Sequence, residues 1–563
     1  MNNASLELGG TNWAEKDGNI LGYSVGDTSG KYSPQEFTFA RGSNLSATRI
    51  DRAGLIVKGR ENLVFYSQDF SNAAWIKSNV SITANQSDPI GGTSAFLVEN
   101  QSTAGNYMYQ NNAPDGCFSI YAKAGNRDSF SIISGTYGNG AYFDLAAETT
   151  TSYGTGSLSV ISSVGNDWYR CSVFVSTGVD FLITLSTING GGDLVGDNMY
   201  FAFAQVELGT IASPYIESGA TNGTAGVLEN TPRLNYTTGV ANPYLLLEPS
   251  RTNLIEQSEY FNSSYWIKSG SPTVSVSDNA GISPEGVSNA TRFVAASAQQ
   301  STRLYTSVTW TAVPYTLSLY VKNNGGTNTN LRFSYYDGTG QYFSPTFTLT
   351  DEWQRIEYTF TPTASSGGFW IVNTPTGGLN LDLLAFGAQL EIGSYPTSYI
   401  PTYSVSATRA QDTCNKTNAS GEIGQTEGTL FTEVDLNHTS VTNNYILQVS
   451  ESSANRILLY KDATNKIGCF ALIGSTAIYY KLTSGAFTGI NKIAFAYKSG
   501  DFAFYVNGTQ IGTSTATFST SATFDRLDID SNIVSENGFF NYNQVALYKE
   551  RLTNAELATL TTI

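Results

Sequence analysis

Two acidic residues in the C-terminal quarter are the best candidates for catalysis in this sequence. Glu433 and Asp435 alternate along an expected strand, so their carboxylates lie on one face. Hydrolysis of a glycosidic bond needs such a carboxylate pair. Catalytic triads usually need a histidine base, and zinc sites need several histidine or cysteine ligands, but the chain has one histidine, His438. We therefore interpret the pair as part of a solvated strand face and expect no enzymatic activity. A glycosidase or polysaccharide depolymerase is the alternative.

A second group of acids could hold a metal ion. Asp525, Asp528 and Asp530 lie close together, and Asn532 follows them. Carboxylate and amide oxygens are the ligands that Ca²⁺ prefers. Clustered acids near a turn more often face solvent, so we expect no cofactor, and calcium is the one ion to consider.

Two tryptophans, Trp75 and Trp266, are candidates for glycan binding. A sugar-stacking platform needs an exposed aromatic face. Both tryptophans stand in the same sequence context, which favours a buried anchor for neighbouring strands instead. We interpret two further acids in matched contexts, Glu207 and Glu391, as structural groups that accept hydrogen bonds from backbone amides near a turn.

The four cysteines are Cys117, Cys171, Cys414 and Cys469, and none forms a CxxC pair. A zinc site is therefore not expected. We expect Cys117 and Cys171 to be buried thiols, because free cysteine packs as a small hydrophobe. A disulfide between them is the alternative.

The composition is poor in charge. Of 563 residues only 13% are charged, about half the usual share of roughly 25%, so Ser, Thr, Asn, Gln and Gly must form the surface. The net charge of −16 argues against nucleic acid or an anionic membrane as partners, because both require basic clusters. The N-terminus lacks the features of a secretory signal, and no apolar run approaches the roughly 20 residues of a membrane span. We expect synthesis in a cytoplasm without a signal peptide.

An internal repeat organises the first three quarters of the chain. Residues 62–78, NLVFYSQDFSNAAWIKS, match residues 253–269, NLIEQSEYFNSSYWIKS. Three further matches follow in the same order: 118–125 with 317–324, 167–175 with 352–360, and 203–216 with 387–400. Four ordered matches indicate two copies of one module.

Each copy alternates apolar and polar residues with a period of two, and Gly- and Asn-rich stretches interrupt the alternation. Many short strands with frequent turns predict a sandwich or jelly roll. We therefore expect an all-β fold with three tandem sandwich modules. The expected divisions are an N-terminal attachment segment 1–60, a first repeat 61–221, a bridging segment 222–251, a second repeat 252–412, and a different module 413–563.

The last module has its own signals. Residues 430–436, 493–497 and 502–506 read as strands, and the third runs into Asn507-Gly508. Asn-Gly between apolar strands predicts a tight hairpin, because a type I′ turn needs positive φ at both central residues. Thr553 and Glu556 have the spacing of a capping box and predict a short terminal helix.

Several of these segments resemble a recurrent pattern of tailed-bacteriophage fibre and virion surface proteins. The resemblance is carried by FTFARGSNLSATRIDRAGLI (37–56), TPRLNYTTG (231–239), YLLLEPSRTNLIEQSEYF (244–261) and TSYIPTYSVSATRAQD (397–412). The repeats resemble carbohydrate-binding modules. The last module resembles concanavalin A/laminin G-type sandwiches, through INKIAFAYKSGDFAFYVNGTQIG (490–512) and NQVALYKERLTNAELATL (543–560). Glycosidases on the concanavalin scaffold can carry a Glu-x-Asp-x-x-Glu strand, whose last acid is His438 here.

The resemblance implies a structural protein on the virion surface, in a head fibre, a tail fibre or a capsid decoration. Its implied partners are other virion proteins and host cell-surface glycans. By analogy with fibres it implies a homo-oligomer, with a trimer as the first expectation. A ligand-free structural spacer is a further alternative.

Overall fold

The structure is a computed structural model, and its strands give an all-β molecule, as the sequence predicts. It describes residues 4–10, 13–16, 19–25, 32–43, 45–135, 138–154, 157–186, 193–237, 240–298, 302–327, 329–373, 379–436, 443–529 and 538–563. In these ranges the one helix is α1 (Asn554–Leu560), and its capping box joins Thr553 and Glu556 as expected. Within the same ranges, no helix has the length and apolar character needed to cross a membrane.

The first module consists of two six-stranded antiparallel sheets around one core. One sheet has the order β16 (Leu158–Gly165), β17 (Trp168–Val175), β12 (Gly116–Ala124), β19 (Asn198–Glu207), β10 (Ala95–Asn100) and β9 (Val80–Gln86). The other has the order β15 (Thr149–Tyr153), β14 (Asn139–Asp144), β13 (Ser129–Ser134), β18 (Asp180–Thr184), β11 (Tyr107–Asn111) and β8 (Ile76–Ser78).

The second module repeats this topology without the hairpin strands β15 and β16. One sheet has the order β25 (Ser275–Gly281), β26 (Ala290–Ala298), β34 (Leu379–Ile392), β28 (Tyr315–Asn323) and β32 (Gln354–Phe360). The other has the order β24 (Ile267–Ser269), β27 (Arg303–Thr309), β33 (Ser366–Asn373), β29 (Asn330–Tyr336) and β30 (Gln341–Phe343), and β31 (Phe347–Thr348) pairs with β29. The sequence repeat is therefore also a repeat of strand order.

One asparagine joins three backbone segments in each repeat. The Asn62 amide donates to the carbonyls of Ala204 and Ile216, and its oxygen accepts from the amides of Val64 and Val206. Asn253 makes the same four contacts, with Ala388, Ile400, Ile255 and Leu390. This asparagine clasp closes each sandwich where the chain enters and leaves it.

The remaining strands form a third unit, which we call the split module because three separate parts of the sequence build it. Its strands follow the order β44 (Thr509–Ser514), β43 (Phe502–Val506), β42 (Ile490–Lys498), β37 (Glu427–Asp435), β46 (Phe540–Tyr548), β1 (Leu6–Gly9), β3 (Asn19–Val25), β4 (Tyr32–Ala40), β36 (Thr413–Lys416), β45 (Arg526–Ile529), β38 (Asn444–Ser452), β39 (Asn455–Lys461), β40 (Ile467–Ile473) and β41 (Thr476–Leu482). Asn507 and Gly508 both have positive φ in the β43–β44 hairpin, as the sequence predicts.

The N-terminal strands differ from the expected separate attachment segment 1–60. β1 pairs with β46, and β4 pairs with β36, so they complete the sheets of the split module. β22 (Tyr244–Leu247), from the expected bridging segment 222–251, also pairs with β46. One hydrophobic core includes Leu6, Leu245 and Leu430 from the three parts. The sequence did not predict this arrangement because strands that are far apart in the chain pair at their edges, and such pairing leaves no local sequence pattern.

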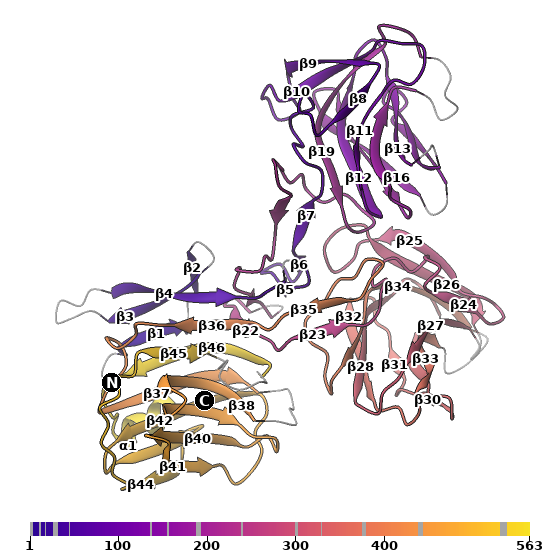
Figure 1. The fold of residues 1–563 in the computed structure, drawn as a ribbon. Coiled ribbons are helices and arrows are strands. Elements are labelled where there is room, and N and C mark those ends of the chain that lie inside the picture. Colours follow the sequence, from indigo (N-terminus) through magenta and orange to yellow (C-terminus); the bar gives the residue numbers. More distant parts are fainter. Residues whose placement is uncertain are drawn as a thin grey trace.

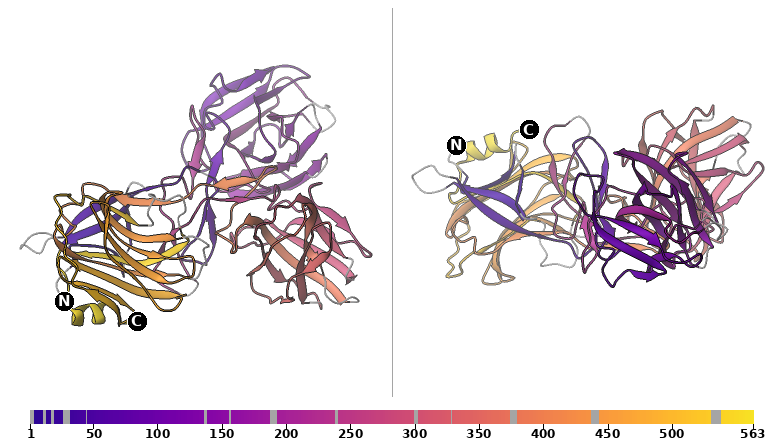
Figure 2. Two further views of the ribbon diagram at one scale, coloured as in Figure 1. Left: turned by 60° about the horizontal axis from the view of Figure 1, so that its bottom comes forward. Right: turned by 90° about the horizontal axis from the view of Figure 1, so that it is seen from above.

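The first two modules are therefore insertions into the split module. The ladder β7 (Arg60–Asn62) to β20 (Gly223–Ala225) brackets the first insertion, and β23 (Arg251–Asn253) to β35 (Ala407–Arg409) brackets the second. The hairpin β5 (Thr48–Ile50) to β6 (Ile56–Lys58) lies at the centre, between the three bodies (Figure 1). Both chain ends lie on the split module, as all views show (Figure 2).

Candidate functional site

The catalytic candidates lie on the outer side of a central strand. Glu433 on β37 approaches Lys492 at 3.6 Å and accepts a hydrogen bond from the Asn543 amide at 2.9 Å. Asp435 is half-buried, two residues further along the same strand. His438 lies outside the described residues. The structure therefore places Glu433 in an ion pair, which favours the structural interpretation of this acid.

The proposed calcium ligands do not share one environment. Asp528 is buried and receives bonds from the Arg526 guanidinium at 2.6 to 2.9 Å. Asp525 is exposed, and Asp530 and Asn532 lie outside the described residues. Within the described ranges, no three His, Cys, Asp or Glu side chains come together in a way that could hold a metal ion.

The two tryptophans occupy equivalent buried positions. Trp75 and Trp266 are each 2% exposed, and each indole N–H donates to a backbone carbonyl nine residues earlier, that of Tyr66 and of Gln257. Burial on this scale leaves no face for sugar stacking. Both rings pack in the cores of their modules, as the repeat favoured, and Trp266 also lines the pocket described below.

The matched acids act on backbone amides as expected. Glu207 accepts from the Ser213 amide at 2.6 Å, and Glu391 accepts from the Thr397 amide at 2.9 Å. The four cysteines are buried free thiols, and burial raises the pKa of Cys117 and Cys171 well above the ordinary value. The structure therefore contains no disulfide between Cys117 and Cys171.

A buried charge network joins the first two modules. Lys58 lies 2.7 Å from Glu259 and 2.8 Å from Glu285, both of the second module. Arg60 reaches Glu285 at 3.2 Å and Glu207 of the first module at 3.5 Å. We call these five residues the Lys58 cluster. Burial alone would lower the pKa of Lys58, but the two glutamates raise it above its usual range. Lys58 therefore stays protonated, and the cluster joins the two modules at one point.

A second buried network, the arginine cluster, ties the second module to the split module. It consists of Arg41, Arg233, Arg409, Glu248 and Asp412, whose side chains are fully buried. Arg233 contacts both acids, while Arg41 reaches Asp412 at 3.2 Å and Arg409 reaches Glu248 at 2.9 Å. Burial alone would raise the pKa of Glu248, but Arg409 and Arg233 hold it well below its usual range.

A pocket of about 570 Å³ opens beside the Lys58 cluster, between the first and second modules. We call it the inter-module pocket. At its edge Phe174 of the first module meets Tyr260 of the second edge-to-face, with ring centroids 4.8 Å apart. Thr210 and Asn279 exchange hydrogen bonds of 2.7 and 3.0 Å across the same junction. Both modules thus supply the walls.

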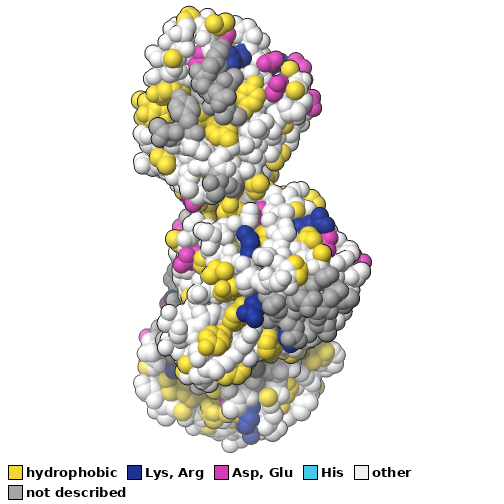
Figure 3. All heavy atoms as spheres, turned by 90° about the vertical axis from the view of Figure 1, so that its right-hand side faces the viewer, with side chains coloured by type: hydrophobic (Ala, Val, Ile, Leu, Met, Phe, Trp, Pro, Cys, Tyr) yellow, Lys and Arg dark blue, Asp and Glu magenta, His cyan; other side chains and the backbone are white. Residues whose placement is uncertain are grey.

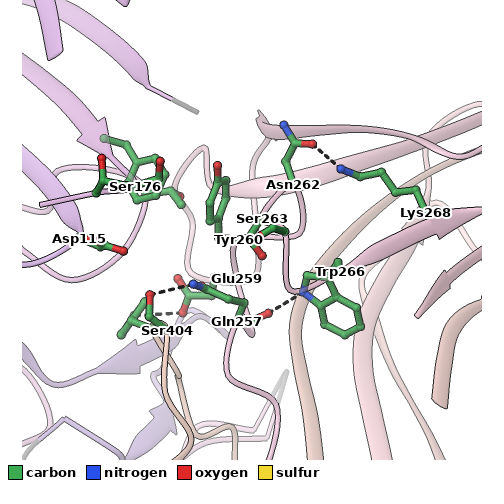
Figure 4. Close-up of a pocket in the computed structure, with 16 residues that line it drawn as sticks. Asp115, Ser176, Gln257, Glu259, Tyr260, Asn262, Ser263, Trp266, Lys268 and Ser404 are labelled. Atoms are coloured by element: carbon green, nitrogen blue, oxygen red, sulfur yellow. Dashed lines mark hydrogen bonds between the residues drawn. The ribbon is translucent and has the colours of Figure 1, made fainter. Parts of the chain in front are cut away.

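Half of the 16 residues that line the pocket have uncharged polar side chains, and the others include four aromatic and three charged residues (Figure 4). Ser263 is 9% exposed, and its hydroxyl has no hydrogen-bond partner. The Gln257 amide donates to Ser404 at 2.9 Å, and the Lys268 ammonium donates to Asn262 at 2.7 Å. Hydroxyl, amide and ammonium groups beside aromatic rings suit a polyhydroxylated ligand, because such a ligand offers both donors and apolar C–H surface.

Five residues of the two charge networks lie in the sequence motifs at 231–239, 244–261 and 397–412 but were not assigned a role there. Arg233, Glu248, Glu259, Arg409 and Asp412 all come from these segments. Local composition could not have found them, because the share of charged residues in these motifs is close to the 13% of the whole chain.

No family model matches the chain, and no curated protein matches it. Among solved structures, a carbohydrate-binding module (CBM40) of a Ruminococcus gnavus IT-sialidase is 17% identical with a TM-score of 0.23, over 26% of this chain and 92% of that chain. The tandem CBM22 domains of Paenibacillus barcinonensis Xyn10C are 11% identical with a TM-score of 0.20, over 63% and 100%. Domains LG4-5 of the mouse laminin α1 chain are 10% identical with a TM-score of 0.17, over 44% and 86%. These neighbours are of the kinds that the motifs resemble, but at these scores they carry no inference about ligand or virion.

Proposed function

We propose that the protein is a non-enzymatic glycan-binding protein on the surface of a tailed-phage particle. The observation that carries the proposal is the inter-module pocket, whose hydroxyl and amide lining includes a buried, unpartnered hydroxyl at Ser263. An unpaired buried hydroxyl costs free energy unless a ligand completes its hydrogen bonds. A sugar hydroxyl provides the matching group.

The surface supports the same proposal. Charged side chains are few and scattered on the face shown in Figure 3, and uncharged groups cover most of it. Such a surface suits contact with hydrated polysaccharide. Weak sites repeated over many copies on a particle would gain strength by avidity.

The place on a virion rests on the resemblance of the junction motifs to phage surface proteins. In this chain those motifs supply the whole arginine cluster and Glu259 of the Lys58 cluster, so part of the resemblance lies in residues that hold the modules together. That supports a shared architecture with such proteins, and the virion location is the part of the proposal that particle analysis must test.

Binding of the full-length protein to an array of bacterial surface polysaccharides tests the glycan part. We expect hits that weaken at least tenfold in Ser263→Ala, with a melting temperature that does not fall, because the removed hydroxyl has no partner within the protein. Hits that Ser263→Ala leaves unchanged would contradict the assignment of this pocket. Mass spectrometry of purified phage particles tests the location, and absence of the protein there would contradict it.

A further inference from the structure

The outer face of strands β38 to β41 in the split module is unusually aromatic. In an antiparallel sheet with one face on a core, outward positions are normally polar. Here Ile446, Ile457 and Cys469 face the core. The alternate positions hold apolar and aromatic side chains that line a hollow of about 280 Å³, which we call the aromatic hollow: Tyr445, Leu458, Tyr460, Phe470 and Tyr480.

Strand register builds the hollow. Tyr445 stands opposite Tyr460, Leu458 opposite Phe470, and Phe470 opposite Tyr480. Buried Leu458 and Tyr460 form its base, while Tyr480 is 55% exposed at its rim. Cross-strand residue pairs from three adjacent pairs of strands therefore lie together at one place on the surface.

A glycine gives the base its shape. The Tyr460 ring lies over Gly468 of the neighbouring strand, where a Cβ atom would come within 2.4 Å of the ring. The Tyr460 and Tyr480 rings are nearly parallel at 26°, with centroids 6.3 Å apart, while Phe470 stands at 81° to Tyr480. The hollow thus offers ring faces in two orientations.

A fixed acceptor and an amide complete the lining. Asp462 lines the hollow, and one of its carboxylate oxygens accepts from the amides of Thr464 and Lys466, each at 2.8 Å. These bonds hold the carboxylate in place. Asn443 lies on the same rim.

We propose that the aromatic hollow is a second glycan-binding site, which takes one sugar ring by stacking on tyrosine. Polarised C–H bonds of a sugar pack on the negative face of an aromatic ring, and the sugar's hydroxyls meet Asp462 and Asn443. A protein partner would need about 800 Å² of surface per side, whereas this hollow has the size of a small-molecule site. The ligand class rests on the proposed function, but the site itself is independent of the inter-module pocket.

Saturation-transfer NMR on the full-length protein tests the site, with methyl glycosides of glucose, galactose, mannose, rhamnose and N-acetylglucosamine as probes. The variants are Tyr480→Ala, the inter-module variant Asn262→Ala/Ser263→Ala, and their combination. Tyr342→Ala is the matched control, because Tyr342 is 40% exposed on the second module.

We expect the inter-module variant to retain a glycoside signal that falls about tenfold when Tyr480→Ala is added. Tyr342→Ala should leave all signals unchanged. If the signals vanish in the inter-module variant and are unchanged in Tyr480→Ala, the second site is contradicted. The proposed function is then still supported. No signal from the unmodified protein with any probe would overturn both.

Discussion

At the scale of single residues, the charged side chains of the two networks lie inside the molecule. Lys58 and the arginines of the second network are buried, although such groups are rarely fully buried unless they are paired. A buried ion pair adds little net stability, but loss of one partner strands the other charge in a medium of low polarity. The networks therefore make the junctions intolerant of single substitutions.

Lys58→Met shortens the side chain by one heavy atom and removes its charge. Glu259 and Glu285 then face each other without the cation they share, and such a loss costs about 3–5 kcal/mol. We expect calorimetry to show a lower melting temperature for the variant. Lys16→Met is the control, because Lys16 and Glu36 form an ion pair that is about half exposed, at 59% and 49%. Equal melting of the two variants would contradict a supporting role for the Lys58 cluster.

Asp278 predicts a pH dependence of stability. Burial raises its pKa to about 6, against hydrogen bonds from Thr291 and the Phe261 amide that lower it. An unfolded aspartate titrates near 3.9, so between about pH 4 and 6 the folded state binds the extra proton. The contribution of Asp278 to stability is thus largest below about pH 4 and falls by about 2 kcal/mol as the pH rises to about 6.

Denaturation of the protein and of Asp278→Asn at pH 4 and pH 7 checks this dependence. The asparagine oxygen can still accept both hydrogen bonds but does not titrate. We expect the variant to gain relative stability at pH 7. A constant difference between the two proteins across this range would contradict a titrating Asp278.

At the scale of elements, the asparagine clasp explains why the two repeats keep the same start. Each Asn side chain satisfies two carbonyls and two amides that belong to different segments. No shorter or apolar side chain can make four such bonds. The Asn-Leu pair that both repeats share, at residues 62–63 and 253–254, reflects this set of hydrogen bonds.

Asn62→Ala and Asn253→Ala should each destabilise their own module. Each leaves buried backbone groups unsatisfied, at about 1–3 kcal/mol for a group. Hydrogen exchange followed by mass spectrometry should show faster exchange in β19 for Asn62→Ala and in β34 for Asn253→Ala. Exchange that rises equally in both modules of either variant would contradict a local clasp.

Local signals in the sequence were sufficient for the elements. Alternation predicted the strands, Asn507-Gly508 predicted its hairpin, and Thr553 with Glu556 predicted the helix cap, because each depends on neighbours in the chain. The pairing of β1 with β46 was missed, since register between distant strands leaves no local pattern. The inter-module pocket was missed for the same reason, as Phe174 and Tyr260 meet only after both modules have folded.

At the scale of the whole molecule, the insertion topology determines which modules can fold as separate fragments. The first module draws both of its sheets from one continuous stretch of chain, whereas the split module needs strands from three. A fragment that contains the whole first module should fold. A fragment that contains only one of the three parts of the split module should not.

We expect fragment 60–226 to give a cooperative melting transition and the circular dichroism of a β protein. Fragment 413–563 lacks β1, β4 and β22, so its strands β46 and β36 have open edges and part of the core is missing. It should aggregate or stay unfolded. Addition of residues 1–43 and 231–250 through short linkers should restore a melting transition. A stable, monomeric fragment 413–563 would contradict the split module.

The insertion topology also determines the order in which interacting segments leave the ribosome. The ion pair between Arg41 and Asp412 joins residues 371 positions apart, and ribosomes add about 5–20 residues per second, so Arg41 is made roughly 20–75 s before Asp412. During that interval the two inserted bodies emerge and can fold to completion. The earliest part of the nascent chain is therefore among the last to gain its partners, because β1 pairs with β46 near the end of the chain.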